Sequence, residues 1–291
     1  MYIRLALGPV LYHWNRDQLL DFYQEVAEAP VEIVYLGETV CPKRRSLRWT
    51  EWLKIGQMLK DRGKEVVLST LTLVEAESDL SQIERTCRNG EFLVEANDTA
   101  AIHVLVENGR PFVGGPALNV YNAQTLARIQ QLGLVRWIPP LELSGAGLRT
   151  ITRERHPSAP EIELFAYGRM PLAYSARCFT ARAHGLTRDH CDFICGQYPS
   201  GLQVETQDGQ HIFTLNGLQT QSGTTLNLLP HWLELTQAGV GILRISPDAR
   251  NTFELLCRIR NALDDGKAPD VSDLIGDSGN DGYWRGLAGC M

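Results

Sequence analysis

The chain has 291 residues, of which 44% are apolar and 21% charged, as is ordinary for a globular protein with a buried core. Its net charge of −6 argues against a nucleic-acid scaffold, which normally carries a basic surface. No segment approaches the roughly 20 apolar residues that a membrane-spanning helix needs. The N-terminus is interrupted by Arg4 and predicts a strand rather than a signal peptide. We therefore expect a cytoplasmic protein whose seven cysteines stay reduced.

Short β-rich runs alternate with longer amphipathic runs along the chain. The pattern predicts strands at 2–7, 31–36, 65–72, 92–96, 112–114, 135–138, 162–167 and 240–246. It predicts helices at 17–27, 47–61, 80–88, 99–107, 123–132, 145–153 and 251–263. Asp98 before the fourth helix is a typical N-cap residue, and Gly63 and Gly133 follow helix ends.

Eight strands that alternate with helices favour a TIM-barrel-like (β/α)8 fold of the α/β class, because parallel strands need crossover helices. An open doubly wound sheet is the competing architecture. Its dinucleotide-binding form loses support because no Gly-x-Gly-x-x-Gly follows the first strand. We expect one domain over 1–291.

The regular alternation stops after Tyr167. Residues 169–229 are rich in turns and predict a cysteine-bearing insertion between the seventh and eighth strands, with a hairpin formed by 202–206 and 211–215. The tail after Ala268 is rich in Asp, Gly and Ser until Tyr283-Trp284-Arg285 supplies an anchor.

Four cysteines form the most informative pattern. Cys178, Cys191 and Cys195 lie in the predicted insertion, and Cys41 follows the second predicted strand. The loops after the strands of a barrel all open on its C-terminal face, so these distant residues can converge there.

The spacing of these cysteines leaves several interpretations open. Structural zinc sites usually contain Cys-x-x-Cys pairs, which this chain lacks, and a catalytic zinc site needs histidines, of which only His184 and His190 are near. Iron–sulfur clusters also take four thiolates and tolerate wider spacing. Unligated cysteines remain the third possibility. We expect the other three to be bystanders: Cys87 and Cys257 as small buried side chains on helices, and Cys290 at a frayed end.

Other polar residues are candidates for the surroundings of such a site. Arg44 and Arg45 follow Cys41 at a predicted helix start, where an anion such as a dicarboxylate is favoured. Arg177 adjoins Cys178 and is a candidate hydrogen-bond donor to cluster sulfur. The competing interpretation is a solvated helix face for Arg44 and Arg45, and a salt bridge at the rim for Arg177.

Polar residues also end or follow several predicted strands, so they are expected at the barrel rim, where they serve either catalysis or structural pairing. These residues are Glu38, Glu95, Asn97, Asn119 and Glu142. His13, beside Tyr12 and Trp14, is expected to be packed and hydrogen-bonded rather than a proton carrier. The sequence identifies no catalytic residue.

Two runs through these cysteines resemble the collagenase-like peptidase family. They are 35–45, which reads Tyr-Leu-Gly-Glu-Thr-Val-Cys-Pro-Lys-Arg-Arg, and 168–182, which reads Gly-Arg-Met-Pro-Leu-Ala-Tyr-Ser-Ala-Arg-Cys-Phe-Thr-Ala-Arg. The first run is similar to the branch of the family that acts in oxygen-independent ubiquinone biosynthesis. Further similar stretches are 89–96, 117–123 and 282–285.

The resemblance implies a TIM-barrel-like fold and a 4Fe-4S cluster held by Cys41, Cys178, Cys191 and Cys195. It also implies a heterodimer with the paralogue UbiU and cooperation with the lipid-binding protein UbiT. The implied activity is hydroxylation of the aromatic ring of ubiquinone precursors without oxygen, with prephenate as oxygen donor.

Two alternatives keep the fold. One is hydroxylation of RNA bases, which other relatives perform and which the acidic balance disfavours. The other is a non-catalytic, metal-stapled accessory subunit. Peptidase activity is not expected, because the chain contains neither His-Glu-x-x-His nor Gly-x-Ser-x-Gly.

Overall fold

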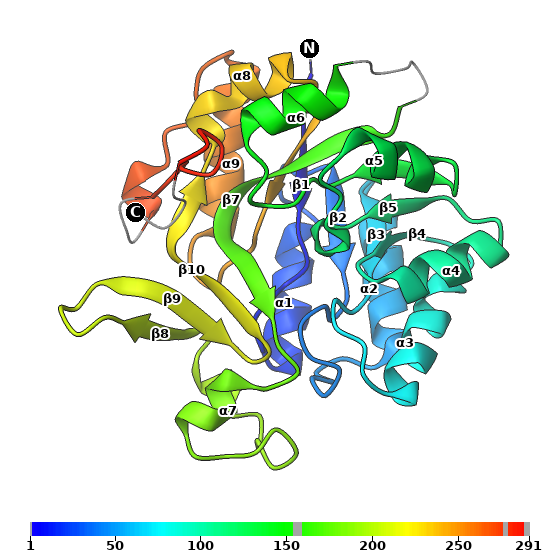
Figure 1. The fold of residues 1–291 in the computed structure, drawn as a ribbon, viewed down its shortest axis with the longest axis vertical. Helices are drawn as coiled ribbons and strands as arrows, with labels where there is room; N and C mark the ends of the chain where they lie inside the picture. Colours follow the sequence, from blue (N-terminus) through cyan, green and yellow to red (C-terminus); the bar gives the residue numbers. More distant parts are fainter. Residues whose placement is uncertain (1, 154–158, 276–278, 288–291) are drawn as a thin grey trace.

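A closed barrel of eight parallel strands forms the body of the protein (Figure 1). The computed structural model describes residues 2–153, 159–275 and 279–287. The barrel closes because β11 pairs in parallel with both β7 and β1, which confirms the predicted TIM-barrel-like fold and rules out the open sheet. Its strands are β1 (Arg4–Leu7), β2 (Ile33–Leu36), β3 (Glu65–Ser69), β4 (Leu93–Ala96), β5 (Phe112–Gly114), β6 (Leu134–Trp137), the first half of β7 (Glu161–Tyr174) and β11 (Ile242–Ile245).

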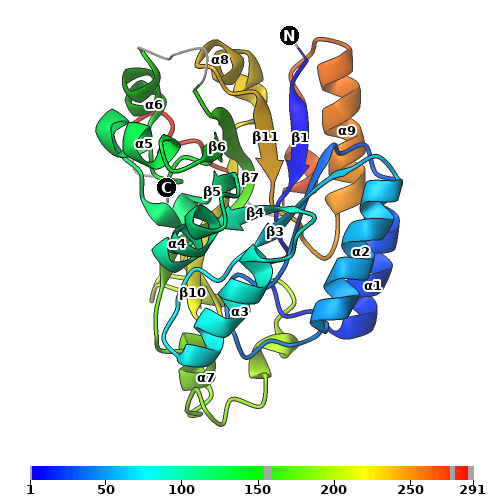
Figure 2. The ribbon, with the colours of Figure 1, turned by 90° about the vertical axis from the view of Figure 1, so that its right-hand side faces the viewer.

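Helices surround this barrel (Figure 2). The seven predicted helices are all present, with ends shifted by at most three residues. They are α1 (Arg16–Val26), α2 (Trp49–Asp61), α3 (Glu77–Cys87), α4 (Thr99–Glu107), α5 (Ala123–Gln130), α6 (Gly145–Thr152) and α9 (Thr252–Asp264). Asp98 caps α4 as predicted, since its side chain accepts the N–H of Ala100.

The insertion between β7 and β11 is larger and more regular than predicted. The regular structure does not stop after Tyr167, because β7 continues to Tyr174 and leaves the barrel. There it pairs with β10 (Gln219–Asn227), which in turn pairs with the predicted hairpin of β8 (Leu202–Glu205) and β9 (His211–Asn216). The short helices α7 (Phe179–Ala183) and α8 (Trp232–Gln237) complete this region.

Gly168 marks the point at which β7 leaves the barrel. Its φ of +129° is a conformation that favours glycine, and a Cβ there would lie 2.5 Å from the side chain of Ser246. The bend therefore depends on glycine. It directs the second half of β7 away from the barrel axis and toward the cysteine-bearing segment (Figure 1).

Charged residues occupy the barrel interior beside apolar ones. Arg244 donates from Nε to Glu163 (2.6 Å) and from Nη1 to Glu95 (2.8 Å), and its guanidinium lies 3.9 Å from the ring centre of Tyr35. Tyr35 in turn donates to Glu163 (2.6 Å), and Arg136 lies 3.7 Å from Glu163. We call these five residues the ionic layer. It crosses the barrel below its C-terminal end.

The C-terminal tail is anchored as the sequence predicts. Trp284 is buried, and its carbonyl accepts the N–H of Gly145 at the start of α6 (2.9 Å). Tyr283 is partly buried against the core. No helix in the described ranges is long and apolar enough to cross a bilayer.

Replacing Gly145 with alanine is expected to destabilise this anchor by about 1–3 kcal/mol, because the new methyl group would lie 2.7 Å from the Trp284 ring. The midpoint of urea unfolding measures the effect. Gly241→Ala is the control, since a Cβ at that position meets no atom of the described residues within 4 Å. Equal losses in both variants would contradict the contact.

Candidate functional site

Cys41 lies in a tight turn after β2. The carboxylate of Glu38 accepts the backbone N–H groups of Val40 (2.8 Å) and Cys41 (3.0 Å). The carbonyl of Cys41 then accepts the N–H of Arg44 (3.0 Å). No helix starts at Arg44, because α2 begins at Trp49, two residues after the predicted start at Leu47. Glu38 therefore shapes the Cys41 turn.

The other three cysteines lie around α7 and the loop that follows it. Cys178 is the N-cap of α7, and its Sγ accepts the N–H of Ala181 (3.4 Å). Asp192 and Phe193 both adopt positive φ angles, of 45° and 53°, which are uncommon for residues other than glycine. These angles bend the chain tightly between Cys191 and Cys195.

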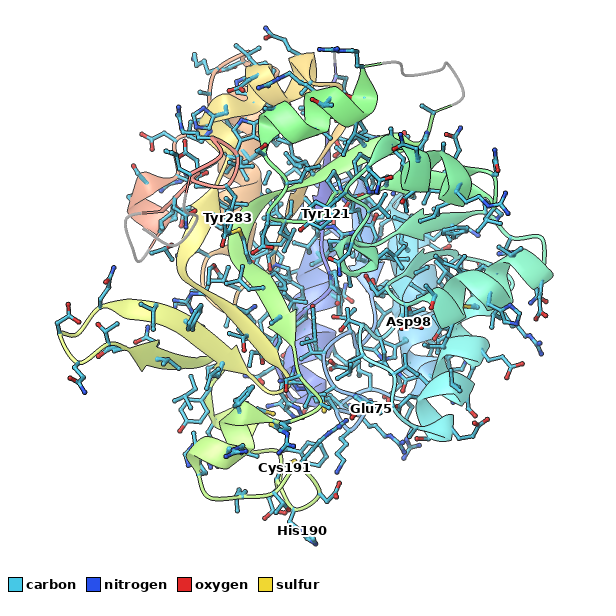
Figure 3. All side chains as sticks on the ribbon, viewed as in Figure 1. Glu75, Asp98, Tyr121, His190, Cys191 and Tyr283 are labelled. Atoms are coloured by element: carbon cyan, nitrogen blue, oxygen red, sulfur yellow. The ribbon has the colours of Figure 1, made fainter. Side chains whose placement is uncertain are left out.

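The four predicted cysteines line one small cavity, which we call the cysteine cavity. Lys43 ties the two segments together, since its Nζ donates to the side chain of Asp189 (2.6 Å) and the carbonyl of Arg188 (3.0 Å). Figure 3 shows Cys191 on the loop after α7, near Glu75, with which Arg188 forms an ion pair. The structure thus brings residues 137 positions apart in the sequence to one place.

Two of the four thiols are weaker acids than a free cysteine. Burial raises the pKa of Cys41 to about 11. Burial also raises the pKa of Cys195, although Arg44 opposes it. These two thiols are therefore protonated at pH 7 unless a bound cation displaces their protons.

Arg44 provides buried positive charge beside these thiols. Its guanidinium donates to the carbonyl of Leu11 (2.8 Å) and to Asn216 (2.7 Å). Burial lowers the pKa of Arg44, but the charges of Glu38 and the neighbouring cysteines outweigh it and leave the pKa raised. Arg44 is therefore not a free anion-binding group, although it can offset the negative charge of a bound cluster.

The remaining candidates near the cysteines occupy other positions. Arg177 is exposed and does not line the cysteine cavity, whereas Arg188 does. His184 is hydrogen-bonded to Tyr198 (2.8 Å) and His190 to Thr187 (3.2 Å), and neither lines the cavity.

His13 is packed as predicted, with its ring 5.4 Å from that of Phe193. Its expected hydrogen bond is missing at Nδ1, which has no partner among the described residues. Burial lowers the pKa of His13 to about 4, and Arg44 adds to the effect, so the ring is neutral at pH 7.

The predictions for the three cysteines outside the cysteine cavity are confirmed in part. Cys87 is buried as predicted. The prediction of burial was wrong for Cys257, which lies on the exposed face of α9. Cys290 lies outside the described residues.

The ends of the barrel strands surround a second cavity of about 440 Å³, which we call the mouth. Four of the five predicted rim residues line it: Glu95, Asn97, Asn119 and Glu142. Arg244 of the ionic layer also lines the mouth, and its Nη2 has no hydrogen-bond partner among the described residues. Apolar side chains cover much of the wall, including Leu11, Leu73, Pro116, Leu141, Phe165 and Leu172.

Leu73 connects the mouth to the apolar side chains around the cysteines. It lines the mouth and also packs against the apolar cluster of Cys178, Ala181 and Leu218, with which Cys41 and Cys191 are in contact. Leu73 does not itself line the cysteine cavity.

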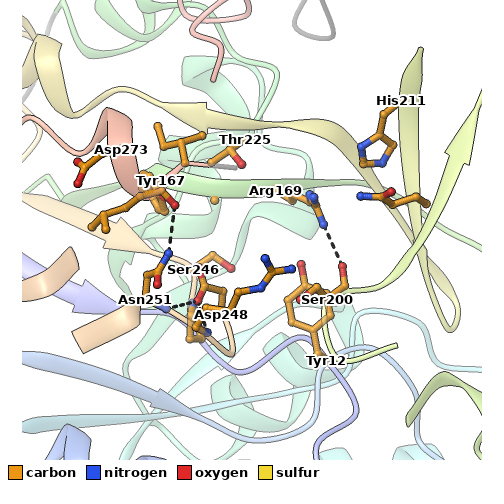
Figure 4. Close-up of a pocket in the computed structure, with 16 residues that line it drawn as sticks. Tyr12, Tyr167, Arg169, Ser200, His211, Thr225, Ser246, Asp248, Asn251 and Asp273 are labelled. Atoms are coloured by element: carbon orange, nitrogen blue, oxygen red, sulfur yellow. Dashed lines mark hydrogen bonds between the residues drawn. The ribbon is translucent and has the colours of Figure 1, made fainter. Parts of the chain in front are cut away.

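A third cavity, of about 410 Å³, lies between the bend of β7, the residues that follow β11 and the β8–β9 hairpin (Figure 4). Arg169 crosses it and donates to the carbonyl of Ser200 (2.9 Å). Asp248 accepts the backbone N–H groups of Arg250 (2.7 Å) and Asn251 (2.8 Å) at the start of α9. The carboxylate of Asp248 thus already occupies N–H groups at the N-terminus of α9. An external anion would find few free donors there.

The ionic layer as a group was not predicted from the sequence. The available signal was a single charged residue inside an otherwise apolar strand, as at Glu95, Glu163 and Arg244. Such residues must pair when the strand closes into a barrel.

Comparison with known proteins identifies one matching family and several solved structures with low sequence identity. The sequence model of peptidase family U32 matches residues 14–261. A solved U32 peptidase is similar over 86% of this chain and 95% of its own, with 13% identity and a TM-score of 0.47. A chain of the tryptophan synthase complex from Pyrococcus furiosus is similar over 90% of this chain and 92% of its own, with 10% identity and a TM-score of 0.44. Type I 3-dehydroquinate dehydratase from Clostridium difficile is similar over 58% of this chain and 77% of its own, with 11% identity and a TM-score of 0.40.

Proposed function

Because the chain belongs to peptidase family U32, we propose that it performs the role of the family member UbiV as a 4Fe-4S protein of oxygen-independent ubiquinone biosynthesis. One observation carries this proposal most directly. Cys41, Cys178, Cys191 and Cys195 line a single cavity. The motif that distinguishes this branch of the family is the run through Cys41.

The donor set of the cysteine cavity is compatible with an iron–sulfur cluster. Four cysteines line the cavity, and no histidine or carboxylate of the described residues does so. Four thiolates are the usual ligand set of a 4Fe-4S cluster. The cavity is small, so admitting a cluster requires a neighbouring side chain such as Phe193, which is 46% exposed, to move outward.

In this proposal the four cysteines hold the cluster, and Arg44 and Arg188 offset its negative charge. The cluster supplies one-electron redox chemistry when bound. Glu38 fixes the backbone of the Cys41 turn, and Lys43 clamps that turn to the loop before Cys191.

The mouth is the proposed binding site for the aromatic ring of the ubiquinone precursor. Its volume of about 440 Å³ suits a small molecule, and its apolar wall with few polar groups is typical of such sites. The contact of Leu73 with the cluster that contains Cys178 supports a position of the ring near the cysteines. The reaction proposed is hydroxylation of a ubiquinone precursor, with prephenate as oxygen donor, UbiU as heterodimer partner and UbiT as the lipid-binding protein.

The pathway assignment is tested by deleting the gene and extracting quinones after anoxic growth. We expect ubiquinone to be absent from the deletion strain and restored by the wild-type gene. Normal ubiquinone in the deletion strain would defeat the assignment.

A bulky substitution in the mouth tests whether the aromatic ring of the ubiquinone precursor binds there. Ala117→Trp places a large side chain in the mouth wall and is expected to abolish anoxic ubiquinone synthesis while the purified protein keeps its iron. Ala268→Trp is the control, because Ala268 is exposed after α9. Full synthesis in the Ala117→Trp strain would show that the ring binds elsewhere, for example on the partner subunit.

A further inference from the structure

A groove of about 550 Å³ opens between the loop before α2 and one face of α3. Ser78, Ser81 and Arg85 lie on the same face of α3, because residues three or four positions apart on a helix are neighbours. Arg45 and Arg48 line the opposite wall. The groove is separate from the mouth, and we call it the arginine groove.

The arginine groove carries a local excess of positive charge. Four arginines and one carboxylate line it: Arg44, Arg45, Arg48, Arg85 and Glu38. Arg44 and Glu38 lie 4.0 Å apart and offset each other. No carboxylate in the described ranges forms an ion pair with the other three arginines, although the charge of Glu51 interacts with that of Arg48. Three exposed guanidinium groups without an ion-pair partner therefore share one groove of a chain whose net charge is −6.

Arg88, another exposed arginine at the end of α3, differs from Arg85 in its partner. Arg88, one turn beyond Arg85 on the chain, pairs with Glu84 at 2.9 Å. Arg85 instead lies over the ring of Trp49, with its guanidinium carbon 5.4 Å from the ring centre. That stacking fixes the group at the groove and leaves its hydrogen-bond donors free for a ligand.

The chemistry of these side chains specifies the kind of ligand. A guanidinium group binds a carboxylate or a phosphate through two parallel hydrogen bonds, and three such groups can hold two acidic groups at once. Trp49 and Trp52 add apolar surface for an organic body. The enclosed volume suits a small molecule rather than a nucleic-acid strand, for which the acidic chain as a whole is also unfavourable.

We propose that the arginine groove binds a small organic dianion whose acidic groups are carboxylates or phosphates. This proposal does not depend on the assignment to ubiquinone biosynthesis, because it uses neither the mouth nor the cluster. Arg44 lines both the groove and the cysteine cavity, so the bound anion lies beside the Cys41 turn.

Titration of the intact protein with isophthalate and with inorganic phosphate at low salt tests the site. Tryptophan fluorescence and calorimetry report binding, and low salt limits screening. We expect saturable binding of at least one probe, and the probe that binds distinguishes a carboxylate ligand from a phosphate ligand. The Arg48→Ala/Arg85→Ala double variant should bind about tenfold or more weakly, because each lost charge-assisted hydrogen bond is worth about a factor of ten.

Arg88→Ala is the matched control, since Arg88 is exposed on the same helix but does not line the groove. Its affinity should stay within about twofold of the wild-type value. Circular dichroism establishes that the variants remain folded. Absence of saturable binding of both probes, or equal affinity in the double variant and the wild-type protein, would overturn the proposal.

Discussion

Replacing Cys191 with alanine is expected to remove the iron from the anaerobically purified protein. Cys191 is one of four thiols that line the cysteine cavity, and the others come from the Cys41 turn, the start of α7 and the short helix after Phe193. The other three thiols without the fourth leave one iron of a 4Fe-4S cluster without a protein ligand. Iron, acid-labile sulfide and visible absorption of the purified variant measure the loss.

Cys257→Ala provides the matched control, because that cysteine is exposed on α9 and lines none of the cavities described above. It should keep the iron content of the wild-type protein. If the Cys191→Ala variant retains as much iron as the control, the assigned ligand set is wrong.

The second large effect is expected at Arg244 in the barrel interior. Its guanidinium pairs with Glu163 (2.6 Å) and Glu95 (2.8 Å), and all three side chains are buried. Arg244→Met removes the cation and leaves two carboxylates without their shared partner. Breaking a buried pair in this way costs about 3–5 kcal/mol of unfolding free energy.

Chemical unfolding of the holoprotein, followed by circular dichroism, measures this loss as a lower midpoint. Arg258→Met is the control, since Arg258 pairs with Glu254 and Asp273 on the surface and should cost less than about 1 kcal/mol. Equal midpoints for the two variants would contradict the role assigned to the ionic layer.

The barrel was predictable because its physical signals are local. Short apolar strands such as 112–114 alternate with capped amphipathic helices such as 99–107, and both have the predicted bounds in the structure. The β10 strand was missed because its sequence, Gln-Thr-Gln-Ser-Gly-Thr-Thr-Leu-Asn, lacks apolar alternation. It is held by its pairing with β7 and β9, which are contacts that a local pattern does not contain.

The convergence of the four cysteines was predictable from the sequence, but the residues around them were not. The order of the loops on a barrel already allowed Cys41 to reach the insertion. Which arginines would lie near the cysteines depended on side-chain packing. Arg177 adjoins Cys178 in sequence but is exposed, whereas Arg44 and Arg188 line the cysteine cavity. The arginine groove likewise combines residues from two helix–loop segments and has no sequence motif.

The metal content of the wild-type protein tests the central claim most directly. Protein purified without oxygen should be brown and contain about four iron and four acid-labile sulfide per chain, as a 4Fe-4S cluster requires. A colourless protein with about one zinc per chain would contradict the proposed cluster. It would favour a non-catalytic accessory subunit in which the cysteines bind a structural zinc ion.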